Sequence, residues 1–356
     1  MYYTGEFEIG TGNSITGNNW GLTMNIGSYP SVSSAGNIPT TGNTNTDGIQ
    51  VYGGSTTNDV FWHDVGEDFI VTFYPNINVG GSLTIDDNVT VRFENGHYIS
   101  VYGSLDANGT SGRNGILFTR RNTDDEWYGL SFNSGSSGSL QYCTIEYATH
   151  FTSYGIFANA PASLNIDHCL LQNNDYGFYG INASPVFNTN NQIINNDLYG
   201  IYLIGDCTPV FGSQLAEWND IYGNTEQDLR NGDNDITVGY VYWGTELYSE
   251  IEDRIYHEVD WDTLGFVNFY PYTNATHDTE FGEPFFGPLH LKIWIEDGTV
   301  HLSWDPVESA IAYKVYSSDT PYVGFEEDLS GSFVDESWST SVINTKKYYF
   351  VTAIRE

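Results

Sequence analysis

The sequence predicts an all-β protein in which a parallel β-solenoid precedes a small antiparallel β-sandwich. The main observation is a Tyr-Gly-apolar triplet that recurs at intervals of 26, 22 and 23 residues, beginning at Tyr128, Tyr154, Tyr176 and Tyr199. A second apolar series advances by 24, 22 and 24 residues, through Leu140, Leu164, Val186 and Val210. Two series with nearly constant spacing indicate coils of constant circumference, and a period of about 23 residues built from short strands fits a parallel β-helix.

Smaller features extend this repeat. Gly-Ser-Leu occurs at residues 81–83, 103–105 and 138–140, which predicts that Leu83, Leu105 and Leu140 are equivalent. Asparagines follow the last strand of several coils, as Asn173-Asn174, Asn195-Asn196 and Asn224. Because Asn tolerates left-handed backbone and its amide can bond to a stacked neighbour, we expect these residues at corners of the solenoid.

Two of the three cysteines repeat in the same way. Cys143 and Cys169 hold equivalent places in successive coils. This placement predicts a stack of buried thiols, with a disulfide between neighbouring coils as the alternative.

The chain divides into four predicted parts. Residues 1–50 are rich in Gly, Asn, Thr and Ser and are expected to cap the first coil, since an open solenoid end exposes core and strand edges. Residues 51–273 form the β-helix, closed by a short helix after Trp243-Gly244. Residues 274–289, with their Gly and Pro, predict a linker, and residues 290–356 form the sandwich.

The N-terminal part contains the only candidate for a cofactor, a calcium ion. Asn43, Asn45 and Asp47, followed by Gly48, alternate like the oxygen ligands of a calcium loop. Gly54 stands where an EF-hand requires its closing Glu, so that motif is incomplete. A plain Asn/Gly turn is the alternative.

The charge balance restricts the partners. There are 46 acidic and 11 basic residues, a net charge of −35, which disfavours nucleic acid, anionic membranes and polyuronates. No stretch approaches 18 consecutive apolar residues, so no membrane insertion is expected. Residues 1–20 lack the basic start and apolar run of a signal peptide. The acidic surface nevertheless suits a secreted protein, and we expect an extracellular or cell-surface location.

The last part of the chain resembles a fibronectin type III domain. Its segments at 300–304, 313–316 and 349–353 alternate as antiparallel sandwich strands do. Trp304 matches the core tryptophan of the family's second strand, Tyr313 opens the third, and Tyr349-x-Val351-x-Ala353 matches the sixth. The resemblance implies a seventh strand, before which the sequence ends.

Residues 50–272 resemble the right-handed parallel β-helix of the pectate-lyase-like superfamily, and especially its repeat-bearing secreted bacterial members. Ile166-Asp167-His168-Cys169 is similar to a pectate lyase segment, but repeat alignment places it on Leu140 to Cys143, ordinary coil positions. Asn122-Thr123-Asp124 is similar to a motif of polygalacturonase-like hydrolases. The other motifs that these enzymes require do not occur in the sequence, so no catalytic residue is predicted.

A binding surface has clearer candidates. If Ile156, Phe178 and Ile201 point inward, the next residue of each strand points outward, and consecutive coils stack ~4.8 Å apart. Phe157, Tyr179 and Tyr202 then form an exposed aromatic ladder. Such rings suit stacking on neutral sugars or on another protein. The alternative is that cross-strand packing simply stabilises the sheet.

Three functions are compatible with these features. The first is a non-catalytic extracellular or cell-surface protein for adhesion, glycan binding or structural assembly, whose partner is a polysaccharide or a cell-surface protein. The second is a polysaccharide lyase or glycoside hydrolase acting on a neutral or weakly charged polysaccharide, with carboxylates beside the loop at residues 122–126. The third is a fibre-forming subunit, in which Tyr3 to Ile9 completes the last domain of a neighbouring subunit.

Overall fold

The computed structural model describes residues 5–110, 115–160, 162–281, 290–307, 310–319, 325–342 and 347–355. The chain separates into two compact units, Met1–Phe281 and Gly282–Glu356. Strands dominate both units, which confirms the all-β prediction. Among the described residues, no helix combines the length and the apolar character needed to cross a membrane.

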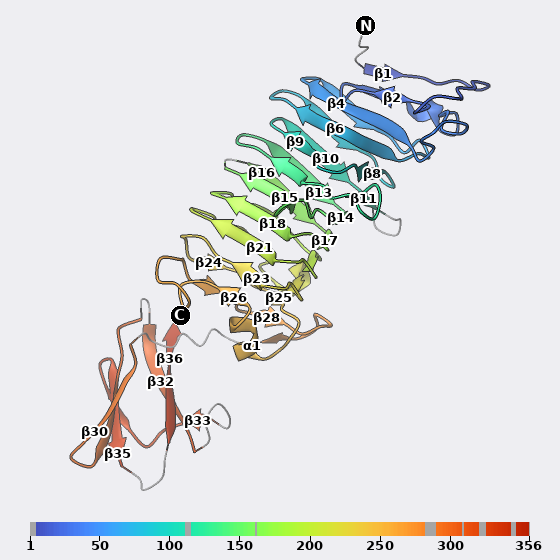
Figure 1. Cartoon of the computed structure of the whole chain (residues 1–356). Helices are drawn as coiled ribbons and strands as arrows, with labels where there is room; N and C mark the ends of the chain where they lie inside the picture. Colours follow the sequence, from blue (N-terminus) through green and yellow to red (C-terminus); the bar gives the residue numbers. More distant parts are fainter. Residues whose placement is uncertain are drawn as a thin grey trace. The chain divides into compact units, whose positions relative to one another are not determined.

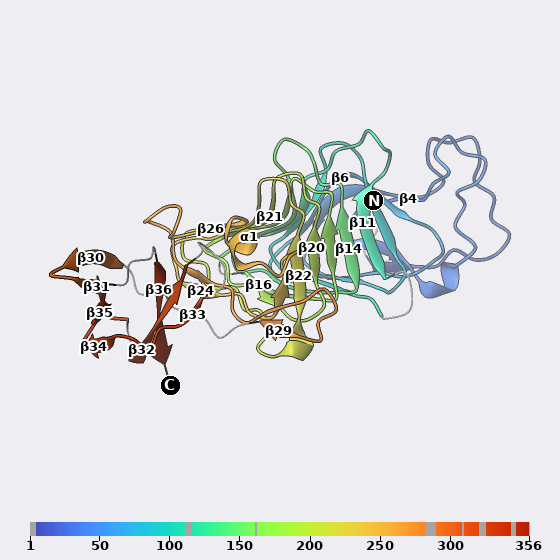
Figure 2. The same ribbon diagram turned by 90° about the horizontal axis from the view of Figure 1, so that it is seen from below.

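The first unit is a parallel β-solenoid of about 10 turns (Figure 1). Its turns place strands on three faces, and equivalent strands of successive turns pair in parallel. The first face consists of β4 (Ile49–Thr56), β6 (Phe69–Ile77), β8 (Thr90–Phe93), β11 (Ile116–Arg120), β14 (Cys143–Glu146), β17 (Leu170–Gln172), β20 (Gln192–Ile194), β22 (Asn219–Tyr222) and β25 (Val241–Tyr242). Figure 2 shows several of these strands side by side.

The second face carries the candidate site. It consists of β9 (Tyr98–Val101), β12 (Gly129–Phe132), β15 (Tyr154–Asn159), β18 (Tyr176–Ile181), β21 (Tyr199–Ile204), β23 (Gln227–Arg230) and β26 (Ile255–Tyr256). The long strands β4 and β6 continue onto it from the first face, since the C-terminal half of β6 pairs with β9. The predicted register of the Tyr-Gly-apolar triplets is confirmed here, because Tyr154 pairs with Tyr176 and Tyr176 pairs with Tyr199.

The third face is a separate sheet of β5 (Asp59–Trp62), β7 (Ser82–Ile85), β10 (Ser104–Asn108), β13 (Ser137–Gln141), β16 (Ser163–Asp167) and β19 (Val186–Phe187). Here the predicted equivalence of Leu83 and Leu105 is confirmed, but the predicted register of Leu140 is wrong by two residues. Leu140 pairs with Ile166, whereas Leu164 and Leu105 both pair with Gly138. The other alignment, which places the segment Ile166 to Cys169 on Leu140 to Cys143, is therefore the correct register.

The reason lies in the interior of that coil. A Cβ atom at Gly138 would lie 2.4 Å from a ring carbon of Phe132 and 2.8 Å from a methyl group of Leu164. The Phe132 ring fills the layer, so a glycine is the residue that fits between the two leucines. Further along, Val186 pairs with Val210 as predicted, but its partner in the preceding coil is Asn165.

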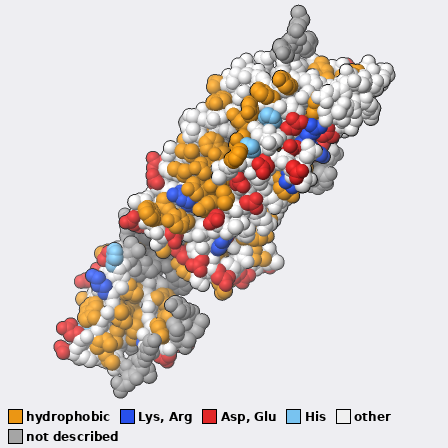
Figure 3. All heavy atoms as spheres, viewed as in Figure 1, with side chains coloured by type: hydrophobic (Ala, Val, Ile, Leu, Met, Phe, Trp, Pro, Cys, Tyr) orange, Lys and Arg blue, Asp and Glu red, His pale blue; other side chains and the backbone are white. Residues whose placement is uncertain are grey.

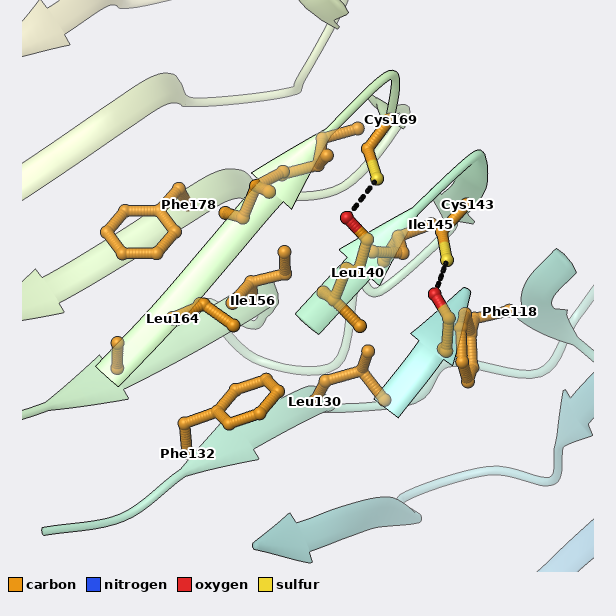
Figure 4. Close-up of a cluster of buried hydrophobic side chains, with 14 of the residues drawn as sticks. Phe118, Leu130, Phe132, Leu140, Cys143, Ile145, Ile156, Leu164, Cys169 and Phe178 are labelled. Carbon is orange, nitrogen blue, oxygen red and sulfur yellow. Dashed lines mark hydrogen bonds between the residues drawn. The ribbon is translucent and has the colours of Figure 1, made fainter. Parts of the chain in front are cut away.

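The solenoid interior is apolar and includes the three cysteines, all of them buried and free. Figure 4 shows two of them, Cys143 and Cys169, among the buried side chains. The Cys143 thiol donates to the carbonyl oxygen of Ala107 at 3.2 Å, and the Cys169 thiol donates to that of Leu140 at 3.4 Å. Burial raises the pKa of Cys143 well above its ordinary value. The buried thiol stack is thus confirmed, and the alternative disulfide is wrong.

A ladder of buried amides runs along one corner of the coils. Asn174 Nδ2 donates to Asn196 Oδ1 at 3.2 Å, and Asn196 Nδ2 donates to Asn224 Oδ1 at 2.8 Å. Asn224 Nδ2 in turn donates to Asp228 at 2.8 Å, where the ladder ends beside Arg254. Each Oδ1 also accepts a backbone N–H of the preceding coil. The predicted corner asparagines are confirmed, and we call Asn174, Asn196 and Asn224 the amide ladder.

The N-terminal residues form the first end of the solenoid. β1 (Gly5–Phe7) pairs with β3 (Ser28–Pro30), the 3-10 helix η1 (Val32–Ser34) follows, and β2 (Thr23–Met24) adds to β4. At the other end, β24 (Ile236–Thr237) pairs with β27 (Val267–Asn268). The short helix α1 (Tyr248–Glu252) lies where the closing helix is predicted.

Part of the predicted linker belongs to the solenoid. β28 (Tyr272–Thr273) and β29 (Glu280–Phe281) form an antiparallel hairpin that reaches into residues 274–281. The boundary between the units therefore follows Phe281. The remainder of the predicted linker, residues 282–289, lies outside the described residues.

The second unit contains two antiparallel sheets. One has the order β30 (Lys292–Glu296), β31 (Thr299–Ser303), β35 (Ser337–Ser341) and β34 (Ser332–Val334), and the other β33 (Glu326–Glu327), β32 (Ala310–Ser318) and β36 (Tyr348–Arg355). Its core consists of Leu302, Trp304, Val315, Trp338 and Val351.

Candidate aromatic binding face

The outward side of β15, β18 and β21 is lined with aromatic rings. Ile156, Phe178 and Ile201 are buried, whereas Phe157, Tyr179 and Tyr202 are each partly exposed. Phe157 pairs with Tyr179, and Tyr179 pairs with Tyr202, so the three predicted residues occupy one row. Their ring centroids are 6.0 and 5.0 Å apart, and the rings of Tyr179 and Tyr202 are stacked at 11°.

A second row, which the sequence reasoning used as a marker but not as a surface, lies beside the first. It contains Tyr154, Tyr176 and Tyr199, the tyrosines of the Tyr-Gly-apolar triplets. Tyr176 and Tyr199 stack at 5.6 Å and 5°. The two rows touch through edge-to-face contacts, such as Tyr176 with Tyr202 at 5.4 Å. We call the rings of both rows the aromatic cluster: Tyr154, Phe157, Tyr176, Tyr179, Tyr199 and Tyr202.

The amide ladder explains why the last three triplets contain glycine, at Gly155, Gly177 and Gly200. A Cβ atom at Gly177 would lie 2.9 Å from Asn196 Nδ2, and one at Gly200 would lie 2.6 Å from Asn224 Nδ2. The backbone therefore passes directly against the buried amides, and only glycine fits there. Tyr176, before the glycine, and Tyr179, after the buried Phe178, are left on the outer surface. The inner ladder thus positions the outer rings.

Other aromatic residues extend the face toward the N-terminal end. Tyr52, Phe73, Tyr74 and Tyr128 are among the exposed large hydrophobic residues. Successive contacts link them, including Tyr52 with Phe73 at 5.7 Å and Tyr98 with Tyr128 at 6.0 Å. Figure 3 shows hydrophobic side chains gathered along this side of the solenoid. The second face is therefore an aromatic strip that spans several coils.

A single cation lies against the aromatic cluster within the described residues. Arg230 pairs with Tyr202 across β21 and β23, and its guanidinium lies 4.6 Å from the Tyr202 ring centroid. This distance is that of a cation–π contact. Arg230 Nη1 also donates to the carbonyl oxygen of Leu203 at 2.8 Å, which fixes the side chain.

The pKa values of Tyr154, Tyr176, Tyr179 and Tyr199 are raised, which keeps these hydroxyls protonated at ordinary pH. Burial, followed by the neighbouring Tyr202 and Tyr179, raises the pKa of Tyr176 to about 12. Burial also raises the pKa values of Tyr154, Tyr179 and Tyr199. No hydrogen bond joins the five tyrosine hydroxyls of the cluster to other described residues. The face therefore combines flat rings with hydroxyl groups that can donate to or accept from a ligand.

The predicted calcium residues have protein partners. Arg121 donates to both Asp47 carboxylate oxygens, at 2.7 and 2.8 Å, and to Asn45 Oδ1 at 2.8 Å. Burial raises the pKa of Asp47, but the hydrogen bond and the charge of Arg121, with smaller contributions from a backbone hydrogen bond and Arg92, together outweigh burial and lower the pKa. Asn43 Oδ1 accepts the Asn18 N–H. Asn45 and Asp47 thus tie the N-terminal residues to the solenoid through Arg121.

The segments that are similar to catalytic motifs occupy structural positions. Asp167 accepts a hydrogen bond from Gln141 at 2.8 Å, and His168 packs on Tyr142 with centroids 4.6 Å apart. These are the coil contacts that repeat alignment predicts. In the loop after β11, Asn122 donates to Asp125 through both its backbone and side-chain nitrogens.

The sequence did not predict a group of buried polar side chains near β22. We call this group, Asp220, His277 and Thr273, the relay. His277 Nε2 lies 3.3 Å from Asp220 Oδ1, and His277 Nδ1 lies 3.0 Å from Thr273 Oγ1. The Trp218 ring stacks on His277 at 3.6 Å. Burial raises the pKa of Asp220 to about 6 and lowers that of His277. Because Thr273 is fully buried, its hydroxyl has no access to a substrate. The relay instead fastens the β28–β29 hairpin to the solenoid.

The aromatic strip is the largest functional candidate in the described part of the solenoid. Its predicted residues lie together, whereas the predicted calcium residues belong to an ion-pair network elsewhere. Comparison with protein-family models, with curated proteins and with solved structures finds no match to this chain.

Proposed function

We propose that this protein is a non-catalytic glycan-binding protein whose aromatic cluster holds a neutral polysaccharide. The observation that carries the proposal is the arrangement of six rings on three consecutive coils, all on one outward face. At a regular strand spacing of ~4.8 Å the rings contact one another continuously, with stacked pairs within each row and edge-to-face contacts between the rows. Sugar rings have apolar faces and polar edges, so they match rings that are bordered by hydroxyl groups.

The charge supports a neutral ligand. A net charge of −35 opposes the approach of polyanions. The raised pKa values of Tyr154, Tyr176, Tyr179 and Tyr199 keep these four hydroxyls of the cluster protonated and uncharged. The ligand would thus be bound by stacking and by hydrogen bonds to hydroxyl groups.

The architecture supports an extracellular rod with an added module. We infer that the solenoid is a right-handed β-helix of the pectate-lyase-like kind and that the second unit is fibronectin type III-like. Trp304 and Val351 lie in the core of that unit, and Tyr313 packs on Trp304 at 5.2 Å. The strand orders β30-β31-β35-β34 and β33-β32-β36 also agree with this inference.

The other two functions stay predictions. For the enzyme, the described residues that are similar to catalytic motifs make coil contacts, and the Thr273 hydroxyl beside His277 is buried. For strand exchange, most of the expected donor, residues 5–9, lies in the described part of the chain, and Gly5–Phe7 pairs with β3 of the same chain. Tyr3 lies outside the described residues.

The test is replacement of Phe157, Tyr179 and Tyr202 together by serine. We expect at least a tenfold loss of retention on insoluble neutral glycans (cellulose, xylan and mannan), because several stacking contacts are lost at once. A Val32→Ser variant is the control, since Val32 is an exposed residue of η1, outside the second face. Circular dichroism checks that both variants fold. Equal retention by the folded triple variant and the control would remove the aromatic cluster as the binding site.

A further inference from the structure

A groove of about 520 Å³ lies at the C-terminal end of the aromatic cluster. It is lined by residues of β21, β23 and β26 and of the segment that follows β26: Tyr199, Glu226, Gln227, Arg230, Tyr256, Trp261, Thr263 and Leu264. Its volume falls in the range of small-ligand sites, about 300–1,000 Å³. Because Tyr199 belongs to the cluster and also lines the groove, the two surfaces are continuous.

Two charged side chains in the groove lack a partner of opposite charge among the described residues. Arg92, Arg121 and Arg254 pair with carboxylates, whereas Arg230, like Arg120, makes no such pair. Glu226 makes no side-chain hydrogen bond or ion pair within the described chain. Both side chains line the same groove. The groove thus offers an available donor and an available acceptor.

The apolar lining of the groove is aromatic. Trp261 is 57% exposed, although it is the largest side-chain type and usually well buried. Tyr256 pairs with Arg230, which pairs with Tyr202 of the cluster. Within the turn that contains Trp261, the backbone is held by hydrogen bonds from Trp261 to His257 and from Leu264 to Trp261. The hydrogen bonds that hold this turn do not involve the indole ring. The exposed ring can therefore contact a ligand.

We infer that this groove binds the terminal residue of a neutral glycan chain whose following residues lie on the aromatic cluster. The inference rests on the proposed function. Vicinal hydroxyls can accept from Arg230 and donate to Glu226 at the same time, while a sugar face stacks on Trp261. The open cluster suits internal residues of a chain. The groove is bordered by the turn after β26, so it suits the end of a chain.

The experiment compares short and long forms of the same glycans. The probes are hexasaccharides of β-1,4-linked glucose, xylose and mannose, and water-soluble substituted polymers that contain the same linkages (hydroxyethylcellulose, arabinoxylan and glucomannan), which present few chain ends for their mass. Trp261→Ala and Glu226→Gln test the groove. Trp294→Ala and Glu258→Gln are matched controls, because Trp294 is an exposed tryptophan of the other unit and Glu258 is exposed outside the groove. Affinities are measured by calorimetry.

We expect each groove variant to bind the recognised hexasaccharide about tenfold more weakly, and the corresponding polymer less than twofold more weakly. The two controls match the wild type on both probes. This pattern arises because a hexasaccharide must place an end in the groove to fill the face, whereas a polymer can bind the cluster through internal residues.

Other outcomes separate the two proposals. If the groove variants bind hexasaccharides as well as the wild type does, and the serine triple variant loses binding, glycan binding stands and recognition of a chain end is wrong. An equal loss on hexasaccharide and polymer also overturns end recognition, because the groove would then hold internal residues. If the wild type binds no probe of either length, the proposed function fails and the inference fails with it.

Discussion

The amide ladder and the aromatic cluster run along the same coils, and in both of them similar side chains stack on one another. They differ in whether their polar groups are hydrogen-bonded within the protein. In the ladder, each amide nitrogen and oxygen is bonded to a neighbouring amide or to the backbone. In the cluster, the rings pack 4.8–6.0 Å apart and their hydroxyls make no hydrogen bond to other described residues. Burial is the cause of this difference, since an unpaired polar group costs little in water and much in a protein interior.

The two stacks are also connected. Gly155, Gly177 and Gly200 lie between them, each with an amide of the ladder within 2.9 Å of the place where a Cβ atom would stand. A change on the inside can therefore move the rings outside, whereas a change to an outer ring leaves the amides paired. Stability should thus depend mostly on the inner stack and ligand binding mostly on the outer one.

The largest effect is expected when the ladder is interrupted. Asn196→Leu removes the amide oxygen that accepts from the backbone and side-chain nitrogens of Asn174, and the amide nitrogen that donates to Leu171. The N–H of Asn174 and the carbonyl oxygen of Leu171 then lose these partners in the interior. We expect the free energy of unfolding to fall by about 3–5 kcal/mol, measured by urea denaturation. Asn188→Leu, at an exposed asparagine, is the control and should change stability by less than about 0.5 kcal/mol. Equal effects of the two substitutions would mean that the ladder has no special role.

A smaller effect is expected when the spacer between the stacks is enlarged. The new Cβ atom in Gly177→Ala would lie 2.7 Å from the Gly200 carbonyl oxygen and 2.9 Å from Asn196 Nδ2, so β18 must shift. We expect a loss of about 1–3 kcal/mol and, because Tyr176 and Tyr179 move with the strand, weaker glycan retention. Gly10→Ala, where a Cβ atom meets nothing within 4 Å, is the control. Unchanged retention by folded Gly177→Ala would contradict the coupling of the two stacks.

The smallest effect concerns the protonation of the cluster. Tyr176 has a pKa of about 12 in the folded state, against an ordinary value of 10.0, because burial disfavours the phenolate. The raised pKa of Tyr176 contributes fully to the free energy of unfolding below about pH 10. This contribution is lost as the pH rises from about 10 to 12, because in that range the unfolded state has released the proton and the folded state still holds it. The difference in tyrosinate absorbance between the wild type and Tyr176→Phe measures this titration.

A substitution of the neighbouring Tyr202 tests the cause of the raised pKa of Tyr176. Tyr202 is the first of the charged neighbours that raise the pKa of Tyr176 at high pH. Tyr202→Phe should therefore lower the pKa of Tyr176 without restoring its ordinary value. Titration of Tyr176 near 10 in the unaltered protein would show that the cluster is more hydrated than its packing implies.

The periodic features were accessible from the sequence because every coil repeats the same local requirement. The Tyr-Gly-apolar triplets, the outward row of Phe157, Tyr179 and Tyr202, the corner asparagines and the stacked thiols each follow from position within a period. The third face shows where such counting fails. Gly138, rather than Leu140, lies opposite Leu164, because the Phe132 ring from another face occupies the layer, and residue spacing contains no information about that ring.

By itself, then, the sequence determined the solenoid, its repeat and the residues that form the outward aromatic row, since these depend on local alternation and constant spacing. Only the tertiary structure decided which distant residues meet. It joined Asp47 to Arg121, Asp220 to His277, and Arg230 and Trp261 to one groove. These contacts arise where the periodic coils end or carry loops, and there the packing of whole segments, rather than the repeat, determines which side chains lie together.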